Sequence, residues 1–267
     1  MTLKEMQSIA AGTLALFIQT IHDVPFAEND IVIEFTPKRN YVERFEALCA
    51  QYAPDRPIND AHRYALENVS FANAIIGREK SAVVLKIDYR IDEESLRRIV
   101  FHELMHIYCG KTEMDAEHFI DVFGSGHTPD PDPEDTTYDG YLSAGYFVWN
   151  EFIAEYFATV KTGQPIHMFV DIADYVCGLL GEICVTNAES KTIFAMTSAY
   201  ILTCGDIDGV IDEIDGLAES RETGNALKSC LRDLYDHVRT EKPWKITEEF
   251  IADFGCKYLT FTMLNSF

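Results

Sequence analysis

The pattern of apolar and polar positions divides the chain into an early part with strands and a long helical part. Apolar residues recur on one helical face within residues 3–21, which predicts an amphipathic first helix. β-Branched runs at 30–35 and 81–90 predict two strands, with a helical pattern at 38–52 between them. From about Tyr141 the pattern is helical almost to the end of the sequence. The patterns predict an α+β protein that is mostly helical, with a small N-terminal sheet and a helical C-terminal part.

A further helix is predicted after the second strand, and its composition is unusual. Asp92 is placed to cap its N-terminus and Gly110 to end it. The stretch FHELMH (101–106) carries two histidines and a glutamate, although apolar residues occupy almost the whole circumference of the helix around it. Burying an unpaired carboxylate is costly, so Glu103 requires a cation or bound water beside it.

The two histidines and the glutamate have the spacing of a zinc site. His102 and His106 are four residues apart, so both lie on one face of a helix, and Glu103 projects beside them. This is the HExxH arrangement, in which two imidazoles bind Zn²⁺ and the glutamate acts on the metal-bound water. The competing interpretation is a helix whose polar stripe lies in water, which the apolar flanks disfavour.

A second apolar stretch, GYFVWNEFIAEYFATV (145–160), carries a matching acidic stripe. Glu151 and Glu155 are four residues apart on one helical face, where like charges repel. A positive charge is therefore expected opposite them. Zinc bound by Glu151, with Glu155 accepting a hydrogen bond from the outer nitrogen of a ligand histidine, satisfies both acids.

Together, these residues resemble those of the gluzincin zinc metallopeptidases, in the thermolysin-like arrangement, and the second stretch is similar to the glutamate helix of ImmA/IrrE-type regulatory peptidases. The resemblance implies a zincin-like catalytic core. It implies His102, His106 and Glu151 as zinc ligands, Glu103 as general base, and Glu155 in the second shell behind His102. His106 and Glu151 are 45 positions apart, which is longer than the thermolysin-like spacing.

Other patterns of zinc ligands fit this sequence less well. A metzincin requires Gly and His where this chain has Cys109 and Thr112. The weaker options for a third ligand are Asp115, Glu117 and His118. The group that stabilises the oxyanion in such enzymes has five candidates, Tyr146, Tyr156, His118, His127 and His167, and no motif selects among them.

The segment 111–140 separates the two motifs and is rich in proline and acidic residues. It predicts a surface loop or lid, between an α+β part at 1–110 and a helical part at 141–267. Calcium binding by its acidic cluster is disfavoured, because the glycine and glutamate of a calcium loop are missing.

Composition limits the partners. The chain has 22 basic and 44 acidic side chains, a formal charge of -22, which disfavours nucleic acid and anionic membranes as partners. Seven cysteines without CxxC spacing indicate reduced thiols and a cytoplasmic protein. Residues 9–18 have the length of a signal-peptide apolar region, but they fit the amphipathic helix better, and no membrane span is predicted.

The functional expectation is a zinc-dependent metallopeptidase that hydrolyses peptide or protein substrates, with Glu103 activating the water. The strand at 81–90 directly precedes the HExxH helix, and an edge strand in such a position can pair with an extended substrate. The alternative is a zinc-binding regulatory or protein-interaction module without general proteolytic activity.

Overall fold

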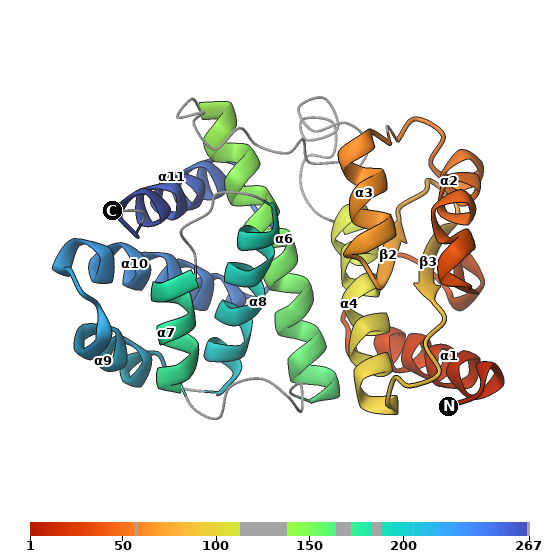
Figure 1. Cartoon of the computed structure of the whole chain (residues 1–267), viewed down its shortest axis with the longest axis horizontal. Helices are drawn as coiled ribbons and strands as arrows, with labels where there is room; N and C mark the ends of the chain where they lie inside the picture. The colour runs from red at the N-terminus through yellow and green to blue at the C-terminus, as the bar shows by residue number, and fades with distance from the viewer. Residues whose placement is uncertain (57, 113–137, 164–171, 183–187, 205, 266–267) are drawn as a thin grey trace. The chain divides into compact units, whose positions relative to one another are not determined.

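The computed structural model of the chain describes residues 1–56, 58–112, 138–163, 172–182, 188–204 and 206–265. The chain divides into two compact units (Figure 1). Unit 1 comprises Met1–His127 and Lys161–Gly163, and unit 2 comprises Thr128–Val160 and Gln164–Phe267. Most of the acidic, proline-rich segment, residues 113–137, lies outside the described residues, as does the acidic cluster considered for calcium.

Unit 1 combines helices with a small sheet. Its elements are α1 (Leu3–Thr20), η1 (Glu28–Asp30), β1 (Ile31–Thr36), η2 (Lys38–Asn40), α2 (Tyr41–Tyr52), α3 (Asp60–Asn68), β2 (Ala72–Ile75), β3 (Ser81–Lys86) and α4 (Glu93–Thr112). The predicted first helix, both predicted strands and the helix after the first strand are therefore confirmed. The pattern did not reveal α3 or β2, which are short elements.

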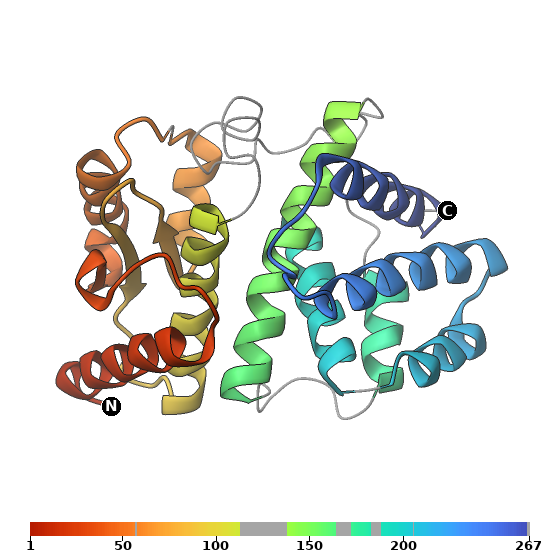
Figure 2. The ribbon, with the colours of Figure 1, turned by 180° about the vertical axis from the view of Figure 1, so that it is seen from behind.

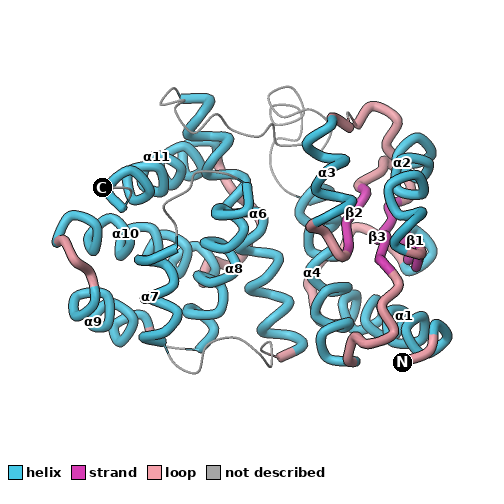
Figure 3. Tube along the Cα trace, in the orientation of Figure 1, coloured by secondary structure: helices cyan, strands magenta, loops and turns pink. Residues whose placement is uncertain are grey.

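The sheet of the described residues has the strand order β1-β3-β2, drawn in magenta in Figure 3. β1 runs parallel to β3, from the pair Ile31 and Ser81 to the pair Thr36 and Lys86. β2 runs antiparallel to β3. β3 is thus the central strand, and the expectation that residues 81–90 offer an edge for a substrate is wrong. The edge strands of the described sheet are β1 and β2, because β3 pairs with β1 on one side and with β2 on the other.

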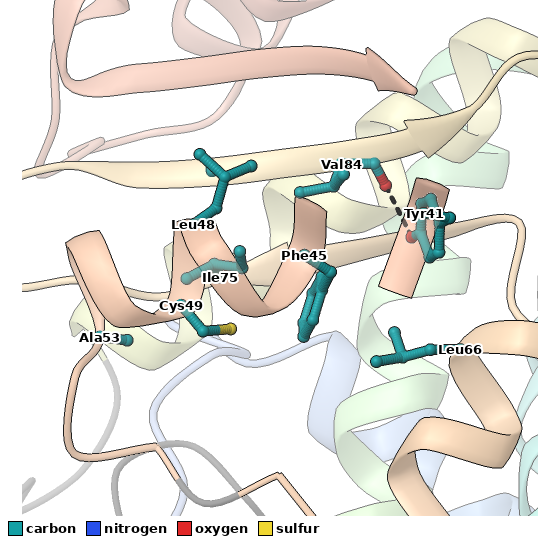
Figure 4. Packing of buried hydrophobic residues seen from close by; sticks show 9 residues of the cluster. Tyr41, Phe45, Leu48, Cys49, Ala53, Leu66, Ile75 and Val84 are labelled. Atoms are coloured by element: carbon teal, nitrogen blue, oxygen red, sulfur yellow. Dashed lines mark hydrogen bonds between the residues drawn. The ribbon is translucent and has the colours of Figure 1, made fainter. Parts of the chain in front are cut away.

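Helices cover both faces of this sheet. On one face, the apolar sides of α2 and α3 pack against the inward residues of β2 and β3. This cluster comprises Tyr41, Phe45, Leu48, Cys49, Ala53, Leu66, Ile75, Ala82 and Val84 (Figure 4). The Tyr41 hydroxyl donates a hydrogen bond of 2.9 Å to the carbonyl of Val84, which ties α2 to the central strand. Strand residues alternate between faces, so Val83 and Leu85 face the other side.

On that other side, α1 and α4 pack against each other, as Figure 2 shows in red and yellow. The ring of Phe17 lies 4.8 Å from that of Phe101, centroid to centroid, and both side chains are fully buried. The apolar stripe that predicted the first helix is therefore the surface that α1 buries against α4. Burial of this kind holds the HExxH helix in place beside α1 on this face of the sheet.

The two ends of α4 differ in how well the sequence predicted them. The backbone N–H of Ser95 donates to Asp92 Oδ1 over 2.7 Å, so the predicted N-cap is confirmed. Gly110 does not end the helix, which continues to Thr112. A Cβ at Gly110 would lie 2.5 Å from Cδ1 of Ile76, so Gly110 packs closely against this side chain, which would have to shift for a larger residue.

Unit 2 is helical throughout its described residues. Its helices are α6 (Tyr138–Thr162), α7 (Ile172–Glu182), α8 (Ala188–Cys204), α9 (Ile207–Leu217), α10 (Arg221–Val238) and α11 (Glu248–Asn265). α10 packs against α11 and α9, and α7 packs against α8 and α9. The Phe194 ring of α8 lies 5.0 Å from the Tyr258 ring of α11. The prediction of a mostly helical α+β protein with a small sheet is confirmed, and no described helix is long and apolar enough to span a membrane.

Candidate metal centre

The two histidines of the HExxH motif converge within α4. Their Nε2 atoms are 2.9 Å apart, and their rings meet edge to face with centroids 4.7 Å apart. Ligand nitrogens of one tetrahedral zinc ion, each about 2.0–2.1 Å from the metal, are separated by roughly 3.3 Å. Both side chains are only half-buried, whereas the neighbouring residues of α4 from Val100 to Cys109 are buried. Helical spacing thus brings two imidazole nitrogens to one accessible point.

Glu103, the predicted general base, lies between the two histidines in sequence, and its side chain is 8% exposed. Two groups of unit 1 interact with it electrostatically. Burial raises the pKa of Tyr41 well above its ordinary value, and the charge of Glu103 raises it further. Burial lowers the pKa of Arg56, and electrostatic interactions with Cys49 and Glu103 oppose this decrease. Glu103 is therefore a buried carboxylate that interacts electrostatically with a guanidinium.

In unit 2, the acidic stripe lies on α6 as predicted. Glu151 is half-buried, and Glu155 is 1% exposed. The Tyr200 hydroxyl of α8 donates a buried hydrogen bond of 2.7 Å to Glu155 Oε1. A hydrogen bond to an ionised acceptor is short and strong, so it both stabilises the buried carboxylate and fixes its direction. The predicted bond from a ligand histidine to Glu155 stays a prediction.

Three of the predicted residues form a group that can hold a metal ion. His102, His106 and Glu151 each offer one ligand atom, and these three atoms lie within 4.8 Å of one another. Two imidazole nitrogens and one carboxylate oxygen form a donor set that fits a divalent transition metal and leaves a fourth position open. The identity of the metal is not fixed by the three side chains alone.

The candidates for oxyanion stabilisation are only partly described. The Tyr146 ring lies 6.1 Å from the Trp149 ring. Tyr156 contacts the rings of Phe152 and Phe157, and burial raises its pKa. His118, His127 and His167 lie outside the described residues, as do the alternative ligands Asp115 and Glu117. No role is assigned to either tyrosine by these contacts.

Sequence reasoning did not single out two residues that interact with Glu103 or Glu155. Arg56 stands between two turn-forming segments, and Tyr200 stands in an uncharged run, so neither position carries a motif. Each becomes notable only through a tertiary contact: Arg56 bonds to the carbonyl of Ala74, and Tyr200 bonds to Glu155.

The chain was also compared with known proteins. No protein-family model, no curated protein and no solved structure matches it. The resemblance to gluzincins therefore depends on the two motifs and on the side chains that they bring together.

Proposed function

We propose that the protein is a zinc-dependent metallopeptidase with a zincin-like catalytic core, in which His102, His106 and Glu151 bind the metal. The observation that carries the proposal is the grouping of one ligand atom from each of these residues within 4.8 Å. Zinc is the metal proposed because two imidazoles and one carboxylate, with an open fourth position, form the ligand set of catalytic zinc sites.

When bound there, zinc supplies Lewis acidity toward a substrate carbonyl and toward water. The other steps belong to the chain itself. Glu103 accepts a proton from the attacking water at its carboxylate, and afterwards delivers that proton to the amine that leaves. Glu103 is buried within α4 and interacts electrostatically with Arg56, and an opposite charge nearby favours the carboxylate that the transfer requires. The reaction class is hydrolysis of a peptide bond.

Glu155 supports this site indirectly in the proposal. A buried carboxylate that hydrogen-bonds the outer nitrogen of a ligand histidine fixes the tautomer and the orientation of that ring. The Tyr200 hydroxyl donates to Oε1 of Glu155, which fixes the direction of this carboxylate. His102 is the ligand proposed to use it.

Elemental mass spectrometry of the purified protein tests the metal first. We expect about one zinc per chain in the wild type, as for a single catalytic site, and a strong loss in Glu151→Ala. Glu213→Ala is the matched control, because Glu213 is an exposed glutamate on another helix of unit 2. A wild-type protein that holds no zinc, even after zinc is added back, contradicts the proposal.

Peptide hydrolysis tests the reaction. Glu103→Gln keeps the size of the side chain but removes its capacity to accept a proton, so it should retain zinc while kcat falls by about 10²-fold or more. Glu94→Gln, an exposed glutamate near the start of the same helix, serves as the control. A zinc-loaded wild type without hydrolysis of any peptide would favour the alternative, a zinc-binding regulatory module.

A further inference from the structure

Among the described residues, β2 pairs with a strand on one side only, that of β3. Lys86 N–H donates to the carbonyl of Phe71 over 2.9 Å, so the alternation of an antiparallel ladder turns Asn73 and Ile75 toward β3. The backbone groups of Ala72 and Ala74 point the other way, and β2 packs against α4, the helix with the HExxH motif. Such an edge can accept an extended peptide through main-chain hydrogen bonds.

Arg56 closes one end of this edge. Its Nη1 donates to the carbonyl oxygen of Ala74 over 2.8 Å, and its guanidinium lies 5.4 Å from the centroid of the Phe45 ring. A peptide that pairs with Ala72 therefore meets an occupied carbonyl at Ala74. The peptide backbone cannot continue along the strand there without displacing the arginine.

The guanidinium retains unused hydrogen-bonding capacity. It has five N–H donors in a planar fork. Its Nε is buried, and among the described residues that atom has no hydrogen-bond partner. No carboxylate of the described part of the chain forms an ion pair with Arg56. The side chain as a whole is half-buried, so part of it remains accessible to a ligand.

The neighbouring groups do not neutralise this cation by contact. Arginine keeps its proton at neutral pH. Burial raises the pKa of the Cys49 thiol to about 11, so this neighbour is uncharged at neutral pH. Glu103 acts on Arg56 only at a distance, and in the proposed reaction its charge serves the water. A half-buried cation that contacts no anion of the described residues favours a carboxylate supplied by a ligand.

We propose that Arg56 binds a carboxylate of the substrate at the closed end of the β2 edge, and that the substrates are peptides whose terminal carboxylate lies close to the cleaved bond. A chain that ends beside Ala74 places its terminal carboxylate on the guanidinium, which prefers this planar, two-oxygen partner. An aspartate or glutamate side chain offers the same chemistry from within a longer chain. This inference rests on the proposed peptidase function.

Three matched sets of peptides distinguish the sources of the carboxylate. The first set has a free C-terminus and no acidic side chain, the second has the same sequences as C-terminal amides, and the third consists of amides with one internal glutamate. The zinc-loaded full chain should cleave the first set near its C-terminus. Its kcat/KM for this set should exceed that for the amides by about tenfold or more, because the amides lack the charged group that would hydrogen-bond Arg56. Preference for the third set would assign the carboxylate to a side chain.

Arg56→Gln should abolish the preference, and Arg56→Lys should keep part of it, since lysine retains the charge but loses the fork. Arg63→Gln is the control, because Arg63 is half exposed and pairs with Glu46. Binding of the peptides to zinc-loaded Glu103→Gln, with and without Arg56→Gln, measures recognition without turnover. Equal cleavage and binding of acids and amides by the wild type would overturn the inference, as would a preference that survives in Arg56→Gln.

The two proposals fail in different ways. A protein that holds zinc but cleaves none of the sets contradicts the peptidase function, while the binding comparison still decides whether Arg56 recognises a carboxylate. Circular dichroism of Arg56→Gln and Arg56→Lys checks that both variants fold. Should only the lysine variant fold, a preference equal to that of the wild type would count against the guanidinium fork.

Discussion

Tyr200 and Glu155 form a buried pair whose partners are 45 residues apart in sequence. Tyr200→Phe removes the hydroxyl and leaves a carboxylate that is 1% exposed without that donor. Because Glu155 is proposed to orient a ligand histidine, we expect the dissociation constant for zinc to rise by about tenfold or more, as for other groups that position metal ligands. Competition with a chromophoric chelator measures this change.

The control for Tyr200→Phe is Tyr235→Phe, because Tyr235 packs under Arg239 in the same unit. A double-mutant cycle with Glu155→Gln separates positioning from a loss of fold stability. If Tyr200 acts through Glu155, the two changes should be strongly non-additive in zinc affinity. Zinc affinity in Tyr200→Phe equal to that of the wild type would show that the hydroxyl does not serve the metal.

Among individual residues, the sequence predicted those that lie close together along the chain. His102, Glu103 and His106 are joined by helical geometry alone, so their spacing was sufficient to group them. The role of Arg56 could not be predicted, because its hydrogen-bond partner is the backbone carbonyl of Ala74 on β2, a strand that the apolar pattern did not reveal. Tyr200 could not be predicted either, because an apolar stretch of sequence does not show which of its hydroxyl groups will hydrogen-bond a carboxylate on another helix.

The helices of unit 2 make one contact that leaves no room for side chains. A Cβ at Gly255 of α11 would lie 1.9 Å from the carbonyl oxygen of Tyr141, and a Cβ at Gly145 of α6 would lie 2.1 Å from the carbonyl oxygen of Ile251. Backbone cannot yield as a flexible side chain does. Gly255→Ala should therefore lower the free energy of unfolding by about 3 kcal/mol, at the upper end of the cost of overpacking.

Urea denaturation followed by circular dichroism measures this loss. Gly209→Ala in α9 is the matched control, because a Cβ there meets nothing within 4 Å. Alanine is the better helix former, so this variant should be as stable as the wild type or more stable, by up to about 1 kcal/mol. Equal stability of Gly255→Ala and the wild type would mean that α6 and α11 do not approach each other so closely.

The elements show where periodic patterns are informative and where they fail. β1, β3 and α2 were predicted because each carries a clear apolar pattern, whereas α4 is apolar around most of its circumference and was recognised by its N-cap and its polar residues. β2 has only four residues, two of them alanine, and so gives no pattern. The position of β3 in the centre of the sheet depends on which strands pair. The sequence of a single strand says little about which strands will lie beside it.

For the whole molecule, zinc should contribute directly to stability. A metal that binds the folded chain and not the unfolded one stabilises it by about 2.7 kcal/mol when free zinc is a hundred times its dissociation constant. Thermal unfolding of the metal-free protein should therefore shift upward when zinc is added, and a chelator should reverse the shift. Glu151→Ala should show little of this shift, while Glu213→Ala should behave as the wild type. An identical response of all three proteins would exclude Glu151 as a ligand.

The formal charge of -22 gives the molecule a long-range preference that Arg56 opposes locally. The acidic surface attracts cationic peptides, whereas the guanidinium selects a carboxylate beside the cleaved bond. Peptides with basic residues far from a free C-terminus should therefore be the best substrates, and their kcat/KM should fall as salt rises, because the screening length shortens from about 30 Å at 0.01 M to about 8 Å at 0.15 M. Initial rates at these two ionic strengths, with uncharged side chains in the control peptide, measure the effect. An equal salt response for both peptides would show that the net charge does not steer substrates. The preference for a carboxylate should persist at either ionic strength, because the contact with Arg56 is short.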